Sequence, residues 1–326
     1  MSFGFLLAAA AATTPTQNYR LTNYPDDGQG CVAAKEAVAD RFTAMTRLPV
    51  KAARAYCDDR TGTCTLSLDY EAARSLAVEM TGTPLSQTST YASLAACESD
   101  LATQSQLFAT YTRVPAAFAY CYGQAQPLDL GLSDGQVGLH IEGFGTGVEH
   151  YELETIDLQA SFGAGAGDQV GTTLAAQGLH LARASIKNEI GADTIGPIAP
   201  SLEIAYYAAT PAKFDAVVAW SGSDGACAET LGQAQELLQA AGVAPFLAYC
   251  SPYSGASYAG SFVHFLNDGH VRISDGPTGY ASQETCEADA PRVVAAAQPG
   301  TGWRAVGAVC GIGWHGVEMQ VVSTNR

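Results

Sequence analysis

The sequence predicts an α+β fold of duplicated β-α-β-β repeats: four units in two pairs, helices stapled by disulfides to mainly antiparallel sheets, and a β-rich central insertion. Two observations support this prediction. Eight of the nine cysteines form four pairs of similar spacing (57−31=26, 121−97=24, 250−227=23 and 310−286=24). The residues before each second cysteine also recur, as Ala-Tyr-Cys at Cys57, Cys121 and Cys250 and Ala-Val-Cys at Cys310. Similar spacing and similar context together indicate an internal repeat.

Each predicted unit has the same order of elements: strand, helix, strand, strand. Apolar residues follow the first cysteine at helical spacing, as in Cys227, Leu231 and Leu238. Ser93 and Ser282 stand just before two of the helices, where N-cap residues are expected. After the helix, each unit continues with a Pro/Gly break and a short strand that runs into the second cysteine. It ends with a turn and a strand of alternating apolar and polar residues. Strands before the helices are predicted near 74–80, 214–220 and 271–274.

The fourth unit departs from this pattern at two positions. Pro291 falls early in its helix, so we expect the helix to start late or the proline to lie in its first turn. Val309 stands where the other units carry tyrosine.

Four segments follow from the repeat. The predicted boundaries are 1–17 for an apolar arm or weak signal-like segment, 18–124 for the first pair of repeats, 125–212 for a β-rich central segment, and 213–326 for the second pair. The apolar run at 3–12 is too short to span a bilayer. It resembles either the hydrophobic part of a signal peptide or an ordered arm that contacts a neighbour.

The recurring cysteine pairs predict disulfides and an oxidising environment. The expected bonds are Cys31–Cys57, Cys97–Cys121, Cys227–Cys250 and Cys286–Cys310. Each closes a loop of about 25 residues, worth roughly 3 kcal/mol in the chain-entropy model. Reduced core cysteines are the alternative, and a zinc site is not indicated because close pairs such as C-x₂-C are absent.

Cys64 is the ninth cysteine and is expected to be unpaired. It is interpreted as a buried thiol, as a competitor with Cys57 for Cys31, or as the site of an intermolecular bridge.

The charge balance argues against a nucleic-acid partner. The chain has 16 basic and 32 acidic residues, a formal net charge of -16. Such a chain repels phosphate backbones and anionic membrane surfaces. No nucleic-acid partner and no membrane span are therefore expected.

An acid–histidine cluster is the best candidate for metal or acid/base chemistry. His140 and Glu142 lie on one face of a predicted strand, and His150, Glu152 and Glu154 lie on one face of the next. A hairpin through the intervening glycines would bring the two faces together around a divalent cation. The alternative is the solvated face of a hairpin.

Three further motifs are weak. Gly163, Gly165 and Gly167 form a GxGxG run, which we interpret as a turn because no clear helix follows. Ser257 lacks the final glycine of a nucleophile elbow, and Asp224 is explained by helix-start chemistry. No catalytic, cofactor-binding or metal residue is assigned, and no cofactor is expected.

Aromatic residues concentrate in the second half and suit either a sugar-binding surface or core packing. They are Tyr206, Tyr207, Trp220, Tyr249, Tyr253, Tyr258, Trp303 and Trp314.

The first functional expectation is a non-catalytic structural or decorating component of an extracellular particle, specifically a bacteriophage virion, with other protein subunits as partners. It requires that the run at 3–12 is retained. The alternative is a secreted or periplasmic protein that binds a glycan or a protein, which requires that this run is removed. A secreted hydrolase using acids of the central segment is the third expectation.

Overall fold

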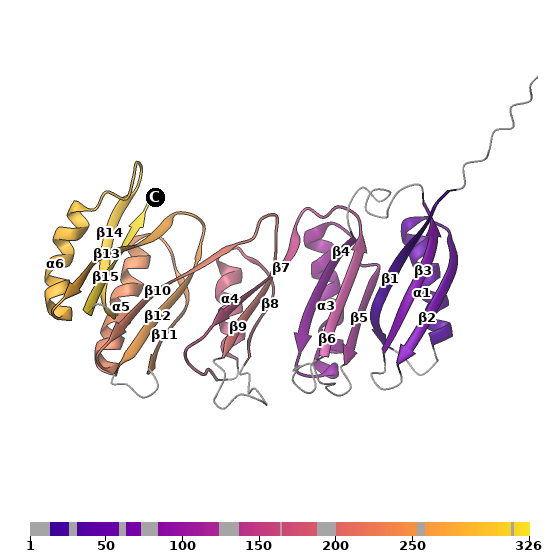
Figure 1. Ribbon diagram of the computed structural model, residues 1–326, viewed down its shortest axis with the longest axis horizontal. Helices are drawn as coiled ribbons and strands as arrows, with labels where there is room; N and C mark the ends of the chain where they lie inside the picture. Colours follow the sequence, from indigo (N-terminus) through magenta and orange to yellow (C-terminus); the bar gives the residue numbers. More distant parts are fainter. Residues whose placement is uncertain are drawn as a thin grey trace, which may run out of the picture. The chain divides into compact units, whose positions relative to one another are not determined.

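The computed structural model divides into two bodies, Met1–Tyr151 and Glu152–Arg326, and each is described by itself (Figure 1). The structure describes residues 14–25, 31–58, 63–72, 84–123, 137–163, 165–187, 200–252, 258–313 and 316–326.

The order strand, helix, strand, strand recurs along both bodies. The N-terminal body contains β1 (Thr16–Pro25), α1 (Cys31–Thr46), β2 (Val50–Asp58), β3 (Thr63–Glu71), β4 (Pro84–Tyr91), α3 (Leu94–Thr112), β5 (Phe118–Gly123) and β6 (Val137–Phe144). The first strand assigned to the C-terminal body, β7 (His150–Asp157), crosses the boundary between the two bodies. This body also contains α4 (Ala166–Ala176), β8 (His180–Lys187), β9 (Ser201–Ala208), β10 (Lys213–Ser221), α5 (Asp224–Ala240), β11 (Pro245–Pro252), β12 (Ala259–Asn267), β13 (Val271–Tyr280), α6 (Gln283–Ala296), β14 (Arg304–Gly313) and β15 (Gly316–Thr324).

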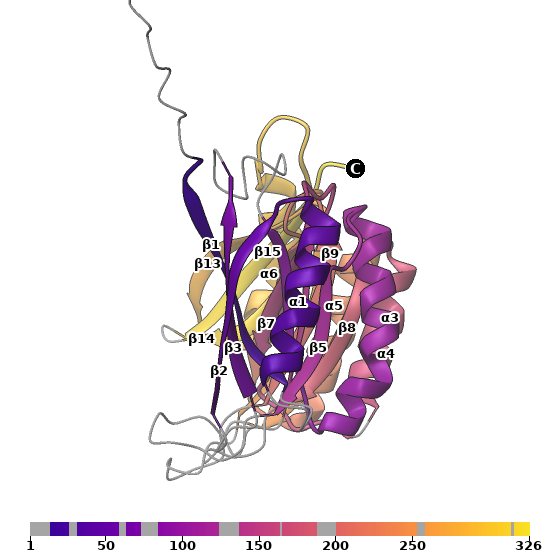
Figure 2. The same cartoon turned by 90° about the vertical axis from the view of Figure 1, so that its right-hand side faces the viewer.

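Five three-stranded sheets share one strand order. The orders are β1-β3-β2, β4-β6-β5, β7-β9-β8, β10-β12-β11 and β13-β15-β14. The third strand of each set therefore lies in the centre, and the helix connects the two edge strands, which is a split β-α-β arrangement. The strand pairs of the first, second, fourth and fifth sheets are antiparallel. We call each β-α-β-β set a module and number the modules 1 to 5 along the chain. In both views, β1, β2 and β3 of module 1 lie beside α1 (Figures 1 and 2).

The fold is α+β, but the central segment differs from the predicted β-rich insertion at 125–212. Strand β6 belongs to module 2, because it pairs with β4 and β5. The remainder forms module 3, with helix α4 between β7 and β8. Module 3 has no cysteine to mark it, and α4 contains Gly167 and Gly171, so neither the cysteine spacing nor helix propensity revealed this module.

The helix starts follow the local chemistry expected from the sequence. Ser93 and Ser282 are confirmed as N-caps, and their side chains accept hydrogen bonds from the backbone N–H groups of Ala96 and Thr285. Pro291 differs from its prediction, because it lies inside α6 rather than in the first turn. The strands predicted at 214–220 and 271–274 lie within β10 and β13, and the one at 74–80 lies outside the described residues.

In the N-terminal body, helix α1 is buried against two sheets. The Phe42 ring lies 5.1 Å from the ring of Tyr19 and 5.2 Å from that of Tyr70, both in module 1. It also lies 5.6 Å from the ring of Phe144 in module 2. One side chain thereby joins the cores of two modules.

The C-terminal body repeats this arrangement twice. Val170 of α4 shares a buried cluster with Phe246 and Tyr249 of module 4. Leu238 of α5 shares another with Val322 of module 5. In each case the helix covers its own sheet and the sheet of the next module, so the modules depend on their neighbours for burial.

The face of the first sheet that points away from its core is polar. Lys51 and Glu71 form an ion pair at 3.2 Å, and Arg54 and Asp69 form one at 2.6 Å. Tyr56 on this face is 75% exposed. Polar outer faces are typical of terminal modules in repeat proteins.

The close contact between β10 and β14 predicts the effect of a substitution at Gly311. A Cβ atom at this position would lie 2.9 Å from both the Ala219 Cβ and the Trp220 backbone nitrogen. Because backbone cannot move aside cheaply, we expect Gly311→Ala to lower the free energy of unfolding by about 1–3 kcal/mol in urea denaturation. Gly123→Ala is the control, because a Cβ there would meet no atom of the described residues within 4 Å. Equal losses in the two variants would contradict the packing described.

Candidate functional site

Three disulfides join the start of a helix to the edge strand that follows it. They are Cys97–Cys121, Cys227–Cys250 and Cys286–Cys310, with Cα–Cα distances of 6.0, 6.1 and 6.0 Å. The helical cysteine of each pair is fully buried. The bonds therefore occupy equivalent places in modules 2, 4 and 5.

Module 1 has a different disulfide. Cys57 bonds to Cys64, which was expected to be unpaired. The two residues face each other across β2 and β3, with their Cα atoms 4.0 Å apart. This register is a property of the folded sheet and is not visible in the cysteine spacing. Cys31 begins α1, and its side chain lies outside the described residues.

The predicted acid–histidine cluster is divided between two sheets. His140 and Glu142 lie together on β6, with the His140 Nε2 3.1 Å from the Glu142 Oε2. The other three members, on β7, belong to module 3, because β7 pairs with β9. The predicted hairpin is therefore wrong, since β6 completes one sheet and β7 starts another. Within the described residues, no three His, Cys, Asp or Glu side chains come together in a way that could hold a metal ion.

The pair on β6 lies in the contact between modules 1 and 2. The Tyr120 ring is 5.0 Å from the His140 ring, and the Tyr120 hydroxyl donates a hydrogen bond of 2.6 Å to the Thr22 carbonyl. Burial, and then the charge of Glu142, raise the pKa of both Tyr19 and Tyr120. The two hydroxyls therefore stay neutral, and this polar group joins the modules rather than exposing a reactive acid or base.

The glycine run leads into a helix, contrary to the expected isolated turn. Gly165 is the N-cap of α4 and has a φ of 88°. A Cβ atom at Gly167 would lie 3.0 Å from the Ala184 carbonyl oxygen on β8. These glycines therefore allow a left-handed start and close helix–strand packing. Asp224 begins α5 directly after the N-cap Ser223, and Ser257 lies outside the described residues.

The aromatic residues of the second half mostly serve the core. Tyr206, Tyr207 and Tyr249 are buried, and Tyr258 is 47% exposed. The Arg272 guanidinium lies 4.4 Å from the centre of the Trp303 ring. Trp220 is half-buried against Phe262, and Tyr253 and Trp314 lie outside the described residues.

A buried histidine lies within this aromatic core. The His264 ring stacks at 5.9 Å from the Tyr249 ring and at 6.5 Å from the Phe262 ring. Its Nε2 atom has no hydrogen-bond partner in the part of the chain that the structure describes. Burial lowers the pKa of His264 to about 4. The imidazole is therefore neutral at neutral pH and acts as a packing group.

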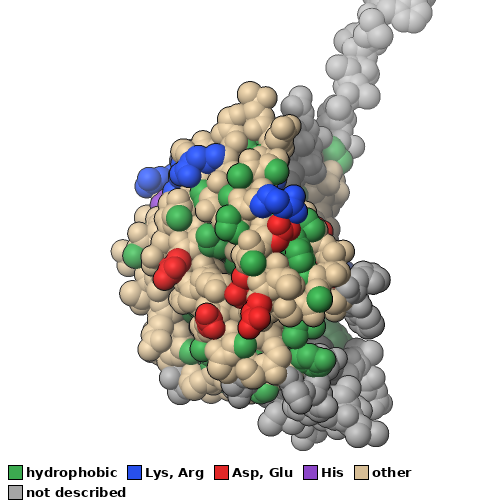
Figure 3. All heavy atoms as spheres, turned by 90° about the vertical axis from the view of Figure 1, so that its left-hand side faces the viewer, with side chains coloured by type: hydrophobic (Ala, Val, Ile, Leu, Met, Phe, Trp, Pro, Cys, Tyr) green, Lys and Arg blue, Asp and Glu red, His purple; other side chains and the backbone are tan. Residues whose placement is uncertain are grey.

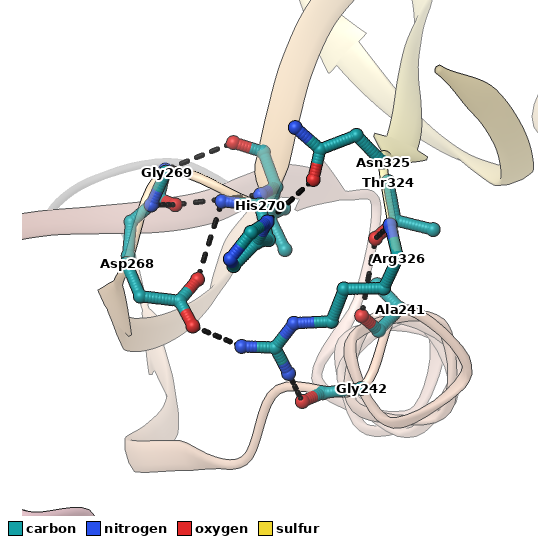
Figure 4. A network of polar contacts seen from close by, with 10 residues as sticks. Ala241, Gly242, Asp268, Gly269, His270, Thr324, Asn325 and Arg326 are labelled. Carbon is teal, nitrogen blue, oxygen red and sulfur yellow. Dashed lines mark hydrogen bonds and ion pairs between the residues drawn. The ribbon is translucent and has the colours of Figure 1, made fainter. Parts of the chain in front are cut away.

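A polar network fixes the C-terminus (Figure 4). The Arg326 guanidinium donates to the Asp268 carboxylate and to the Gly242 carbonyl. The His270 Nδ1 lies 2.6 Å from the Asn325 Oδ1, and the Asn325 N–H donates to the His270 carbonyl at 3.2 Å. The end of β15 is thereby tied to the β12–β13 turn and to the end of α5.

Two clefts of about 380 Å³ each open in the C-terminal body. In the first, Lys213 pairs with Asp215 at 3.0 Å and Asn267 donates to the same carboxylate at 2.5 Å, so these three polar groups satisfy one another. The second lies between β10 and the sheet of module 5. Its lining includes Glu318 and Gln320 and contains no basic side chain among the described residues. It is the candidate binding site of the molecule.

Comparison with known protein families, with curated proteins and with solved structures finds no match to this chain. Among the described helices, none has the length and apolar character needed to cross a membrane.

The low pKa of His264 predicts a specific pH dependence of stability. In the unfolded chain the imidazole takes up a proton near pH 6.5, but in the folded protein only near pH 4. The unfolded state therefore binds more protons in this range, so stability falls as the pH drops from 6.5 through 4, by roughly 3 kcal/mol. We expect His264→Phe to lack this loss when urea unfolding is compared at about pH 7 and about pH 3.5. An equal loss in wild type and variant would contradict the assignment.

The lengths of the loops that the disulfides close predict how much stability is lost when each bond is removed. The pair Cys227–Cys250 spans 23 residues, and Cys57–Cys64 spans 7. Because the longer loop restricts the unfolded chain more, Cys227→Ala/Cys250→Ala should cost about 3 kcal/mol and Cys57→Ala/Cys64→Ala about 2 kcal/mol. Guanidinium denaturation measures both. An undiminished stability of the first variant would show that its bond does not constrain the chain.

Proposed function

We propose that this chain is a non-catalytic structural or decorating component of an extracellular particle, with a bacteriophage virion as the favoured particle. The observation that carries the proposal is the equivalent disulfide in modules 2, 4 and 5. Disulfides of this kind persist in oxidising surroundings and are rare in a reducing cytosol. A particle that must survive outside a cell benefits from helices that are covalently tied to their sheets.

The way the modules are built supports a scaffold role. We take the five modules to be copies of one unit, because their sheets share one strand order. Their interior histidine and acidic side chains are engaged in packing, as with His264 in module 4 and Glu142 in module 2. Burial of this kind favours rigidity over exposed reactive groups.

The described exposed surface suits contacts with other protein subunits that are made through polar side chains. On the described part of the face seen in Figure 3, acidic, basic and apolar side chains are interspersed. Helix α6 of module 5 exposes Glu284, Ala288 and Arg292. In the proposed particle, the apolar run at 3–12 is retained and contacts a neighbouring protein subunit.

A secreted or periplasmic binding protein is the second candidate. The open cleft in the C-terminal body favours it, because binding proteins use concave sites with a few convergent polar groups. In this case the run at 3–12 is removed during export.

The intact mass of the native protein, measured with and without reductant and alkylation, tests the proposal. We expect a mass that includes residues 1–12 and at least eight oxidised thiols, because four disulfides are formed. The same sample after reduction is the control and should alkylate at all nine cysteines.

Two other results would overturn the proposal. A mass that begins near Thr13 with the same oxidised thiols would favour the secreted binding protein. Fully reduced cysteines in the native protein would remove the argument for an extracellular location.

A further inference from the structure

The first cleft of the C-terminal body differs from the second in its charge. Its lining contains two basic side chains, Lys213 and Arg272, and one acidic side chain, Asp215. The charged groups of the lining therefore carry a net positive charge, in a chain whose formal net charge is -16. An anion that is repelled by the chain as a whole is attracted to this cleft.

The Arg272 guanidinium is held in place by two contacts. It lies 4.4 Å from the centre of the Trp303 ring, and it donates a hydrogen bond of 2.9 Å to the Pro299 carbonyl. A guanidinium has five N–H donors, so these contacts fix its plane and still allow it to donate to a ligand. Trp303 also lines the cleft and is half-buried. The cleft therefore contains a positioned cation beside an aromatic ring.

The second cation is placed by a series of polar contacts that starts at a buried side chain. Asn267 is 5% exposed, and its amide nitrogen donates to the Asp215 carboxylate at 2.5 Å and to the Val271 carbonyl at 2.9 Å. Asp215 in turn pairs with the Lys213 Nζ at 3.0 Å. An exposed ion pair of this kind is weak, and an ammonium has three N–H donors, so Lys213 can also donate to a ligand.

The rest of the lining provides apolar surface. Ala216, Val271 and Ile273 line the cleft together with Trp303. The cleft measures about 380 Å³. Sites for small molecules are concave, mostly apolar and supplied with a few convergent polar groups, and this cleft has that composition.

Asp215 determines which anions suit the cleft. Its carboxylate repels an anion that has no hydrogen-bond donors, but it accepts hydrogen bonds from hydroxyl groups. A ligand that carries a carboxylate and hydroxyl groups therefore complements both signs of charge in the lining. The carboxylate matches the donor geometry of Arg272, and the apolar face of a sugar ring can pack against the Trp303 ring.

We infer that this cleft binds a sugar acid, a sugar ring that bears a carboxylate. The carboxylate contacts Arg272 and Lys213, and the hydroxyl groups donate to Asp215. The sugar acid is either free or part of an acidic polysaccharide. The inference rests on the cleft and not on the proposed particle role, so each can fail without the other.

NMR titration of the full chain with methyl α-D-galacturonide tests the inference. The chain has three tryptophans, and the indole N–H signal of Trp303 is the one missing from Trp303→Phe. We expect the ligand to shift this signal saturably and to leave the signal of Trp220, which lines the second cleft, unchanged. A shift of the Trp220 signal alone would overturn the inference.

Two pairs of variants measure the contribution of each cation. Lys213→Gln and Arg272→Gln should each weaken binding about tenfold, because each removes one charged donor. The matched controls are Lys51→Gln and Arg292→Gln, which remove the same charges from exposed ion pairs of 3.2 and 2.6 Å elsewhere and should bind like wild type. Unchanged affinity in both cleft variants would contradict the assignment.

Two related ligands test the recognition on wild-type protein. Methyl α-D-galactoside lacks the carboxylate and cyclohexanecarboxylate lacks the hydroxyl groups, so each should bind at least about tenfold more weakly than the galacturonide. Equal affinity of either ligand would overturn the inference. Tighter binding of trigalacturonate than of the galacturonide would identify a polysaccharide as the source, and the reverse order would identify a free sugar acid.

Discussion

Where two modules of one body meet, the need to cover the second face of a three-stranded sheet is the constraint on which this structure depends. One helix covers only one face, and small sheets are marginal unless more apolar surface is buried. In this molecule a helix is buried between two sheets. Phe42 of α1 packs in such a position in the N-terminal body, and Leu238 of α5 does so in the C-terminal body. Within each body, neighbouring modules are therefore separate in strand pairing but share a core.

The disulfides and the glycines follow from this constraint. In modules 2, 4 and 5 a bond holds the helix start against the following edge strand. Module 3 has no cysteine, and there Gly167 and Gly171 allow α4 to approach β8 closely. A Cβ atom at Gly171 would lie 2.9 Å from a methyl group of Leu181. A disulfide in some modules and close helix–strand packing in module 3 thus hold the equivalent helix against its sheet.

The polar side chains buried near the contacts between modules differ in whether their hydrogen-bonding atoms have partners. His140 and Glu142 satisfy each other between modules 1 and 2, and His264 is enclosed by aromatic rings in module 4. Gln320 stands at the position equivalent to His140 but keeps a buried oxygen without a partner among the described residues. The surface around Gln320 forms a cleft lined by Asp275 and Glu318 and by no basic side chain among the described residues.

The sequence by itself determined what depends on neighbouring residues in the chain. The N-caps Ser93 and Ser282, the strands at β10 and β13, and the acidic, cysteine-rich character could all be predicted from local chemistry and spacing. Only the tertiary structure decided which strands share a sheet and which side chains face each other. The Cys57–Cys64 bond, the separation of β6 from β7, and the open cleft beside Glu318 depend on register and burial, which arise from contacts between residues far apart in the chain.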